Sequence, residues 1–128
     1  MNTKAKGNKL EWAAITALRM AGYTHVQRGS ASKGIDVIAG LILTITNDNT
    51  IAANTVSDVR VVHEPMHSKL FISCKANSYM APAETKELIE IAAFWQATPC
   101  LTKKIYGKNW NIINLLQDNA LITFTMVK

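Results

Sequence analysis

Residues 34–40 read GIDVIAG and residues 70–75 read LFISCK, and each stretch has the composition of a short buried strand with one charged residue. The charged residues are Asp36 in the first stretch and Lys75 in the second. Because side chains alternate along a strand, Ser73 and Lys75 are expected on the same face. An ionised group in an apolar sheet is costly unless it is paired or has a function. The two stretches therefore predict a carboxylate and an ammonium group side by side at the margin of a sheet.

Helical periodicity flanks these two strands. Residues 8–21 carry apolar side chains at helical spacing, and Gly22 follows in the position of a C-terminal cap. A second helix is expected from Pro82 or the next residue to residue 97, because proline and Glu84 both suit a first helical turn. The expected buried stripes consist of Leu10, Ala14, Ala17, Leu18 and Ala21 in the first helix, and of Leu88, Ile91, Ala92 and Trp95 in the second.

The remaining elements are mainly strands. Strands that are close in sequence are expected to pair antiparallel, whereas the crossover through the second helix implies a parallel pair. The expected fold class is α/β, with a mixed central β-sheet flanked by helices, in a single domain over residues 1–128. Residues 1–7 are expected to form a mobile basic arm. Further strands are expected at residues 23–28, 98–104, 110–116 and 120–127, with one or two more within 51–62.

The composition favours a polyanionic partner. The chain of 128 residues has a net charge of +5, and 48% of its residues are hydrophobic, which argues against disorder. A basic surface can also simply keep a small domain in solution. Both cysteines lie in apolar surroundings and are expected to be free buried thiols. With no apolar run near the roughly 18–20 residues of a membrane span and no signal-peptide pattern, we expect a cytoplasmic protein without membrane contact.

The charged residues suit phosphodiester hydrolysis, which needs a cation, an activated water and a held phosphate. Asp36 with one or two further carboxylates can bind a hard divalent cation such as Mg²⁺. Lys75 beside it could orient or deprotonate the attacking water. The small polar loop at residues 29–34 suits a close approach to phosphate. Glu11 flanks the apolar stripe of the first helix and is expected to point toward the sheet margin, although a solvated first-turn glutamate is the alternative.

The ordered set of motifs resembles archaeal-type Holliday-junction resolvases, members of the PD-(D/E)XK nuclease superfamily. The resemblance rests on KGNKLE at residues 6–11, RGS at 28–30, GIDVIAG at 34–40 and FISCK at 71–75. It covers most of the chain except residues 41–69, which are longer than the hairpin usual in the family. The resemblance implies a restriction-endonuclease-like fold. It also implies a homodimer that holds branched DNA and makes paired nicks with Mg²⁺, for which Mn²⁺ can substitute.

The resemblance implies roles for individual residues. Glu11 matches the helix glutamate that helps to bind metal, Asp36 the metal-binding aspartate, and Lys75 the catalytic lysine. Ser73 belongs to the same site but departs from the pattern, since the family has a glutamate two residues before the lysine. Arg28 and Ser30 or Ser32 match the basic strand end and the loop that faces the junction. Apart from the resemblance, the basic residues expected to contact phosphate are Arg28, Lys9, Lys33, Lys69, Lys103 and Lys104.

Three interpretations of Ser73 are open, because a hydroxyl is a far weaker Mg²⁺ ligand than a carboxylate. The missing carboxylate can come from the following helix, where Glu87 is our choice as metal ligand. Glu11, Asp36 and waters can also suffice. In the third interpretation, the protein binds junctions but cleaves them poorly or not at all, as a catalytically degenerate DNA-binding protein. A separate alternative for the function is a restriction- or repair-type nuclease that acts on other DNA substrates. The other acidic residues considered are Glu84 and Glu90 on that helix, and Asp58 and Glu64 in the inserted stretch.

Overall fold

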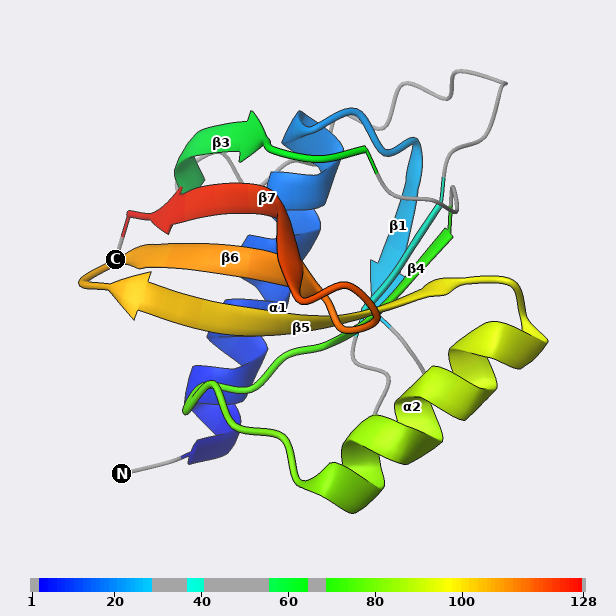
Figure 1. Ribbon diagram of the computed structural model, residues 1–128. Helices are drawn as coiled ribbons and strands as arrows, with labels where there is room; N and C mark the ends of the chain where they lie inside the picture. Colours follow the sequence, from blue (N-terminus) through cyan, green and yellow to red (C-terminus); the bar gives the residue numbers. More distant parts are fainter. Residues whose placement is uncertain (1–2, 29–36, 41–55, 65–68, 128) are drawn as a thin grey trace.

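One mixed sheet organises the molecule (Figure 1). The computed structural model describes residues 3–28, 37–40, 56–64 and 69–127, and of residues 3–8, 28 and 38–40 it describes the backbone alone. Over this part of the chain, seven strands pair in the order β1-β2-β4-β5-β6-β7-β3. The elements are α1 (Thr3–Met20), β1 (His25–Arg28), β2 (Val37–Gly40), β3 (Val56–Val61), β4 (Lys69–Ser73), α2 (Pro82–Phe94), β5 (Thr98–Tyr106), β6 (Asn109–Asn114) and β7 (Asn119–Met126).

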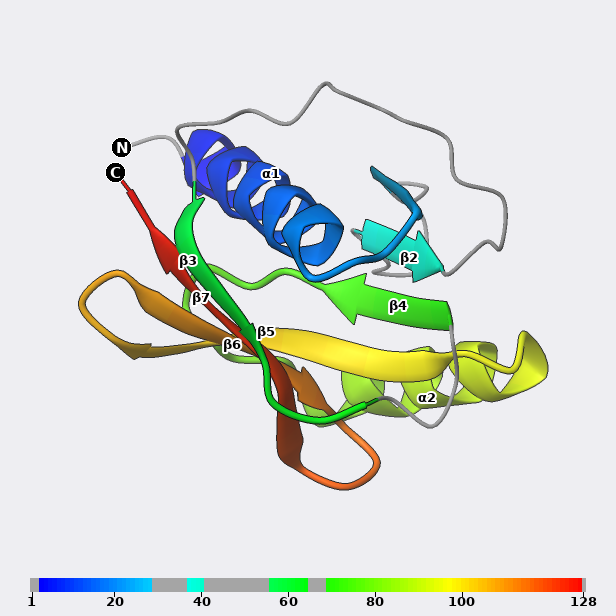
Figure 2. The ribbon, with the colours of Figure 1, turned by 90° about the horizontal axis from the view of Figure 1, so that it is seen from above.

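The pairing of the strands confirms the predicted fold class. β4 and β5 are parallel and are joined through α2, as the crossover requires. The other pairs are antiparallel, including β1 with β2 and β2 with β4. Figure 2 shows α1 and α2 on opposite sides of the sheet. None of the described helices is long and apolar enough to cross a membrane.

The two faces of β4 pack into different cores. Leu70, Ile72 and Cys74 belong to the large core between α1 and the sheet, whereas Phe71 belongs to a smaller core with Leu88 of α2. This confirms the predicted alternation, and it assigns the odd-numbered residues of β4, Ser73 included, to the α2 side. The catalytic lysine predicted two residues later therefore leaves the sheet beside α2.

Helix α1 is longer than predicted. It begins at Thr3, so the expectation of a basic arm over residues 1–7 is wrong for the part that the structure describes. Lysine and alanine are strong helix formers, and an interior glycine costs only about 1 kcal/mol, so Gly7 does not stop the helix. The predicted stripe is confirmed, with Leu10 and Leu18 buried. The helix ends at Met20, one residue before its predicted end, and Gly22 follows in the predicted cap position with a φ of 110°, which is suited to glycine.

Helix α2 ends earlier than predicted, and this changes the environment of one residue. Leu88 and Ala92 are buried as expected, but Trp95 is 56% exposed, so its assignment to the buried stripe is wrong. The helix ends at Phe94 and Gln96 adopts a φ of 55°, so the chain turns before Trp95 can continue the stripe. Phe94 and Trp95 form an exposed edge-to-face pair with ring centroids 5.3 Å apart.

Candidate functional site

The corner of the sheet after β4 brings together a lysine and a glutamate. The ammonium Nζ of Lys75 lies 2.9 Å from Oε2 of Glu84, in the first turn of α2. Both side chains reach solvent, with exposures of 28% for Lys75 and 47% for Glu84. The hydrogen bond from Lys75, aided by its positive charge, lowers the pKa of Glu84. Glu84 is therefore ionised at neutral pH and faces a cationic partner.

A tight turn holds the backbone of Lys75. The N–H of Lys75 donates to Oγ1 of Thr102 on β5 at 3.0 Å, and the carbonyl of Lys75 accepts from the N–H of Ser78 at 2.9 Å. Ser78 has a φ of 61° and accepts through Oγ from the N–H of Lys104 at 2.8 Å. The turn is thus tied to β5 at two points. Sequence analysis did not identify Thr102 and Ser78 as positioning residues, although an Asn-Ser pair is a turn signal.

The N-terminus of α2 holds Glu84 in place. Ala81 precedes the helix and has no side chain that can cap it, so the Oε1 atom of Glu84 accepts from the N–H of Ala81 at 3.4 Å. A carboxylate in the first turn is also favoured by the helix dipole. One oxygen of Glu84 therefore faces its own helix while the other faces Lys75. Of the three helix glutamates considered, Glu84 is the one that contacts Lys75.

Ser73 lies in a different environment from Lys75. Its side chain is fully buried, and among the described residues its Oγ has no hydrogen-bond partner. A buried hydroxyl without a partner is costly, and here it is closed to a cation arriving from solvent. The serine therefore does not replace the glutamate of the resolvase pattern as an accessible ligand.

Ser73→Ala is expected to raise the free energy of unfolding by about 1 kcal/mol, because it removes an unsatisfied buried polar atom. Urea unfolding measures the effect, with Ser78→Ala as a comparison that removes a hydrogen-bonded hydroxyl. A lower stability for Ser73→Ala would show that Oγ has a partner in solution.

The other predicted metal ligands are only partly placed. Asp36 lies outside the described residues. Glu11 is half-buried on α1, on the other side of the sheet from α2, and Glu87 is exposed on α2. Within the described chain, no three side chains of His, Cys, Asp or Glu come together to hold a metal ion. Mg²⁺ is usually bound by one or two carboxylates and several waters, so Glu84 with one further carboxylate would suit it, and Asp36 is the predicted candidate for that second ligand.

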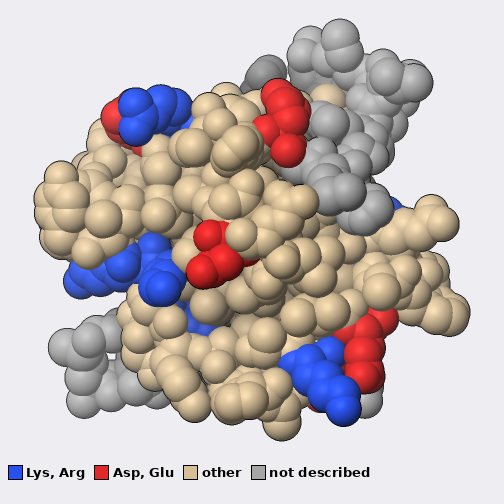
Figure 3. Space-filling view, in the orientation of Figure 1, with Lys and Arg blue, Asp and Glu red and all other residues tan. Residues whose placement is uncertain are grey.

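The predicted DNA-contacting lysines do not form one group. Lys104 adjoins the Lys75 turn, but Lys69 lies at the opposite end of β4, where Nζ donates to the carbonyl of Trp95 at 3.4 Å. Figure 3 shows the charged side chains of one face in small separate groups. Of the remaining candidates, Lys9 and Lys103 are exposed, the backbone alone is described for Arg28, and Ser30, Ser32 and Lys33 lie outside the described residues.

Comparison with known proteins gives a structural relative. No protein-family model and no curated protein sequence matches the chain. Among solved structures, it is similar to Hjc, a Holliday junction resolvase from the archaeal hyperthermophile Archaeoglobus fulgidus, determined at 1.6 Å. The TM-score is 0.58 at 16% sequence identity, and the match covers 94% of this chain and 84% of that one. The two chains share a fold. The match extends over nearly the whole chain, whereas the resemblance of the motifs excluded residues 41–69.

Proposed function

We propose that the protein is a cation-dependent endonuclease that cleaves branched DNA, with the four-way junction as its substrate. The observation that carries the proposal is a lysine–carboxylate corner, with 2.9 Å between Lys75 and Glu84, on a fold shared with a Holliday junction resolvase. The corner opens to solvent at a sheet margin, where an extended DNA strand can reach it. The net charge of +5 favours the approach of DNA.

The proposed ligands of Mg²⁺, or of Mn²⁺ in its place, are Asp36 and a carboxylate of α2, either Glu84 or Glu87. Glu11 is not included in this set, because α1 lies on the other side of the sheet from α2 (Figure 2). When bound there, the cation supplies charge neutralisation at the scissile phosphate. Lys75 supplies a second positive charge, and it orients the attacking water or stabilises the phosphate oxygens. A hard cation prefers carboxylate oxygens, so the donor set fits this group.

The weak ion pair between Lys75 and Glu84 would allow Lys75 to exchange Glu84 for a phosphate oxygen of the substrate. An ion pair at the surface contributes only about 0–1 kcal/mol, since solvent screens it. Lys75 can therefore leave Glu84 for a phosphate oxygen at little cost, while its backbone stays tied to Thr102. Glu84, released from the ammonium, becomes available as a ligand. The ion pair thus serves as a resting arrangement of the site.

We further propose that the protein acts as a homodimer, because two strands of a junction must be cut. The exposed aromatic pair Phe94 and Trp95, at the end of α2, supports this part of the proposal. Aromatic residues are enriched in protein interfaces, and an exposed pair is otherwise costly to hydrate. A two-fold axis near the end of α2 would present two copies of the Lys75 corner to one symmetric substrate.

A second candidate is a DNA-binding protein that does not cleave. The burial of Ser73 favours it, because the residue at the position of the family's glutamate offers no accessible ligand to a cation. The two candidates share the fold and the basic charge, and they differ only in what happens when a divalent cation is added. A nuclease that prefers linear duplex is the third outcome of the same experiment.

The test is cleavage of a supercoiled plasmid with an extruded cruciform. With Mg²⁺ we expect linear plasmid, which requires paired nicks at the junction, and no product when EDTA replaces the cation. Asp36→Asn should lower the rate about 100-fold or more, the scale of removing one preorganised electrostatic group. Binding of a four-way junction in EDTA should stay within about twofold, because phosphate contacts dominate affinity.

Asp118→Asn is the matched control, since Asp118 is an exposed turn residue at which asparagine is well tolerated. Its cleavage rate should equal that of the wild type. Junction binding without cleavage by any divalent cation would establish the second candidate. Equal cleavage of linear duplex would establish the third, and full activity of Asp36→Asn would remove Asp36 from the mechanism.

A further inference from the structure

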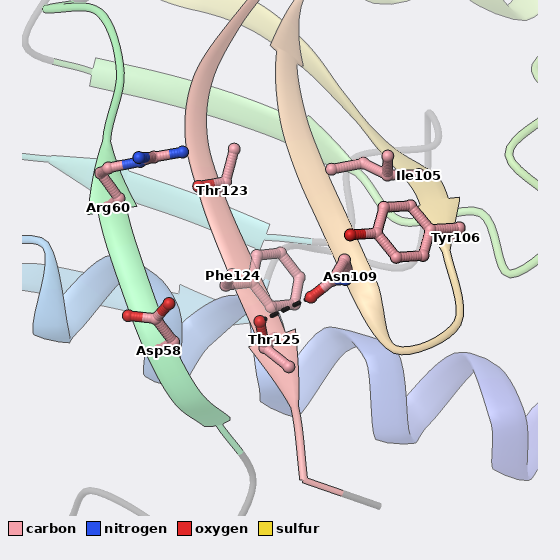
Figure 4. Close-up of a pocket in the computed structure, with 8 residues that line it drawn as sticks. All are labelled: Asp58, Arg60, Ile105, Tyr106, Asn109, Thr123, Phe124 and Thr125. Carbon is pink, nitrogen blue, oxygen red and sulfur yellow. Dashed lines mark hydrogen bonds between the residues drawn. The ribbon is translucent and has the colours of Figure 1, made fainter.

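A groove of about 220 Å³ lies over β3, β7 and β6 and extends to Ile105 and Tyr106 at the end of β5 (Figure 4). It is on the side of the sheet opposite α1, because Phe124 of β7 enters the α1 core and its neighbours Thr123 and Thr125 point the other way. Helix α2 packs on β4 and β5 and leaves this part of the sheet face uncovered (Figure 2). Its polar and aromatic lining includes Asp58, Arg60, Tyr106, Asn109, Thr123 and Thr125.

The strand register aligns this lining in two rows. In one row, Asp58 of β3 lies opposite Thr125 of β7, Thr125 lies opposite Asn109 of β6, and Asn109 lies opposite Tyr106 of β5. In the other row, Arg60 lies opposite Thr123. Directly opposed residues of antiparallel strands present their side chains on one face. Groups from four strands therefore converge on one shallow site.

Several groups in the groove have unused binding capacity. Asp58 and Arg60 are exposed, and over the residues described neither has an ion-pair partner. Thr125 donates through Oγ1 to Oδ1 of Asn109 at 2.7 Å, which fixes the amide and leaves its NH₂ group as a donor. The ring of Tyr106 is 70% exposed, and Figure 4 shows its hydroxyl directed across β6 toward β7.

The charges in the groove select against simple ions. The carboxylate of Asp58 repels a phosphate, and the guanidinium of Arg60 repels a metal cation. Together they offer an acceptor and a donor with no net charge, beside an aromatic ring. This combination suits a neutral planar ligand with both donors and acceptors on its edge. Sites for drug-sized ligands usually enclose about 300–1,000 Å³, so this smaller groove suits a single ring system.

Guanine fits this chemistry best among the bases. Its N1–H and N2–H₂ groups can donate to the Asp58 carboxylate, and its O6 and N7 atoms can accept from Arg60. An exposed tyrosine ring is a common stacking surface for unpaired bases. Adenine offers no pair of adjacent donors to a carboxylate, and the pyrimidines have a smaller surface for stacking.

We propose that this groove binds an unpaired guanine base. That the base comes from DNA rests on the proposed function, because the opened strands at a branch point are a source of unpaired bases. The binding itself needs neither the divalent cation nor the Lys75 corner. The guanine-binding proposal and the nuclease proposal can therefore be tested independently of each other.

The test is an NMR titration of the full ¹⁵N-labelled chain with dGMP, dAMP, dCMP and dTMP in EDTA. We expect dGMP to bind about tenfold more tightly than dCMP, which carries the same phosphate, and to shift the amides of Arg60, Asn109 and Thr123. Equal affinities for dGMP and dCMP, or shifts confined to other parts of the chain, would overturn the proposal. So would the absence of shifts at millimolar nucleotide.

Variants test whether the nucleotide base binds in this groove or elsewhere on the protein. Asp58→Asn should abolish the preference for dGMP, and Tyr106→Leu should weaken every base about tenfold through lost stacking. Tyr79→Leu, at an exposed tyrosine outside the groove, should change nothing. Lys75→Met should bind dGMP like the wild type. If no DNA is cleaved but dGMP still binds in the groove, the guanine-binding proposal is supported and the nuclease proposal is rejected. If Asp58→Asn keeps the preference for dGMP, the guanine-binding proposal is rejected.

Discussion

Lys75→Met is expected to slow nicking of a four-way junction by about 1,000-fold, the upper range for loss of one preorganised electrostatic group. Methionine keeps most of the length of the side chain and removes the charge that faces Glu84 at 2.9 Å. The backbone hydrogen bond to Thr102 does not involve the side chain, so the turn should stay intact. Single-turnover cleavage with Mg²⁺ measures the effect directly, because it excludes product release.

Lys86→Met provides the matched control for this prediction. It removes the same charge from an exposed position on α2, and its cleavage rate should stay within about twofold of the wild type, as surface substitutions usually have small effects. Equal losses in the two variants would mean that overall charge, rather than the Lys75 corner, determines the rate. A fully active Lys75→Met would exclude this corner as the active site.

Leu88→Ala is expected to lower the free energy of unfolding by about 2–5 kcal/mol, the usual cost of truncating a buried leucine. Leu88 is fully buried, and it is the main apolar contact through which α2 meets Phe71 and the small core. That core has few members, so the loss should also loosen α2 relative to the sheet. Urea unfolding measures the stability, and amide hydrogen exchange within α2 measures the loosening.

Lys86→Ala on the same helix should change stability by less than about 0.5 kcal/mol, because its side chain is exposed. If Leu88→Ala also costs less than about 1 kcal/mol, α2 is not anchored as the structure indicates. Because α2 carries Glu84, loosening the helix should also weaken the contact with Lys75. If the nicking rate decreases as amide hydrogen exchange within α2 becomes faster, the packing of α2 contributes to the activity of the Lys75 corner.

The layout of the fold follows from local patterns in the sequence. The apolar run of β4, the helical stripe of α2 and the short return to β5 predict a parallel crossover, and the structure has one. The alternation along β4 also predicts which side Phe71 faces. These features depend on strand and helix periodicity and on chain connectivity, which a single sequence contains.

Element ends are less accessible from sequence. The basic residues 1–7, with little apolar character, predicted an arm, but lysine and alanine favour helix strongly enough to extend α1 to Thr3. Trp95 continues the spacing of the buried stripe, yet the left-handed turn at Gln96 takes it out of the helix. Helix propensity thus decides where α1 begins, and backbone geometry after Phe94 decides where α2 ends.

The candidate site was predictable only in part. Lys75 stood out as a charge at the end of an apolar strand, but its partner depends on where α2 begins. Oε1 of Glu84 reaches the N–H of Ala81, and this places Glu84 rather than Glu87 next to the lysine. The groove gave no sequence signal, because residues as distant as Asp58 and Tyr106 meet only through the strand register.

Binding of Mn²⁺ tests the central claim most directly, since this paramagnetic ion broadens nearby amide signals. Titration of the ¹⁵N-labelled chain should broaden the amides around Lys75 and the first turn of α2 at low Mn²⁺, and Asp36→Asn should abolish this effect. Broadening that centres elsewhere on the chain, or that persists unchanged in Asp36→Asn, would contradict a cation site formed by Asp36 at the Lys75 corner.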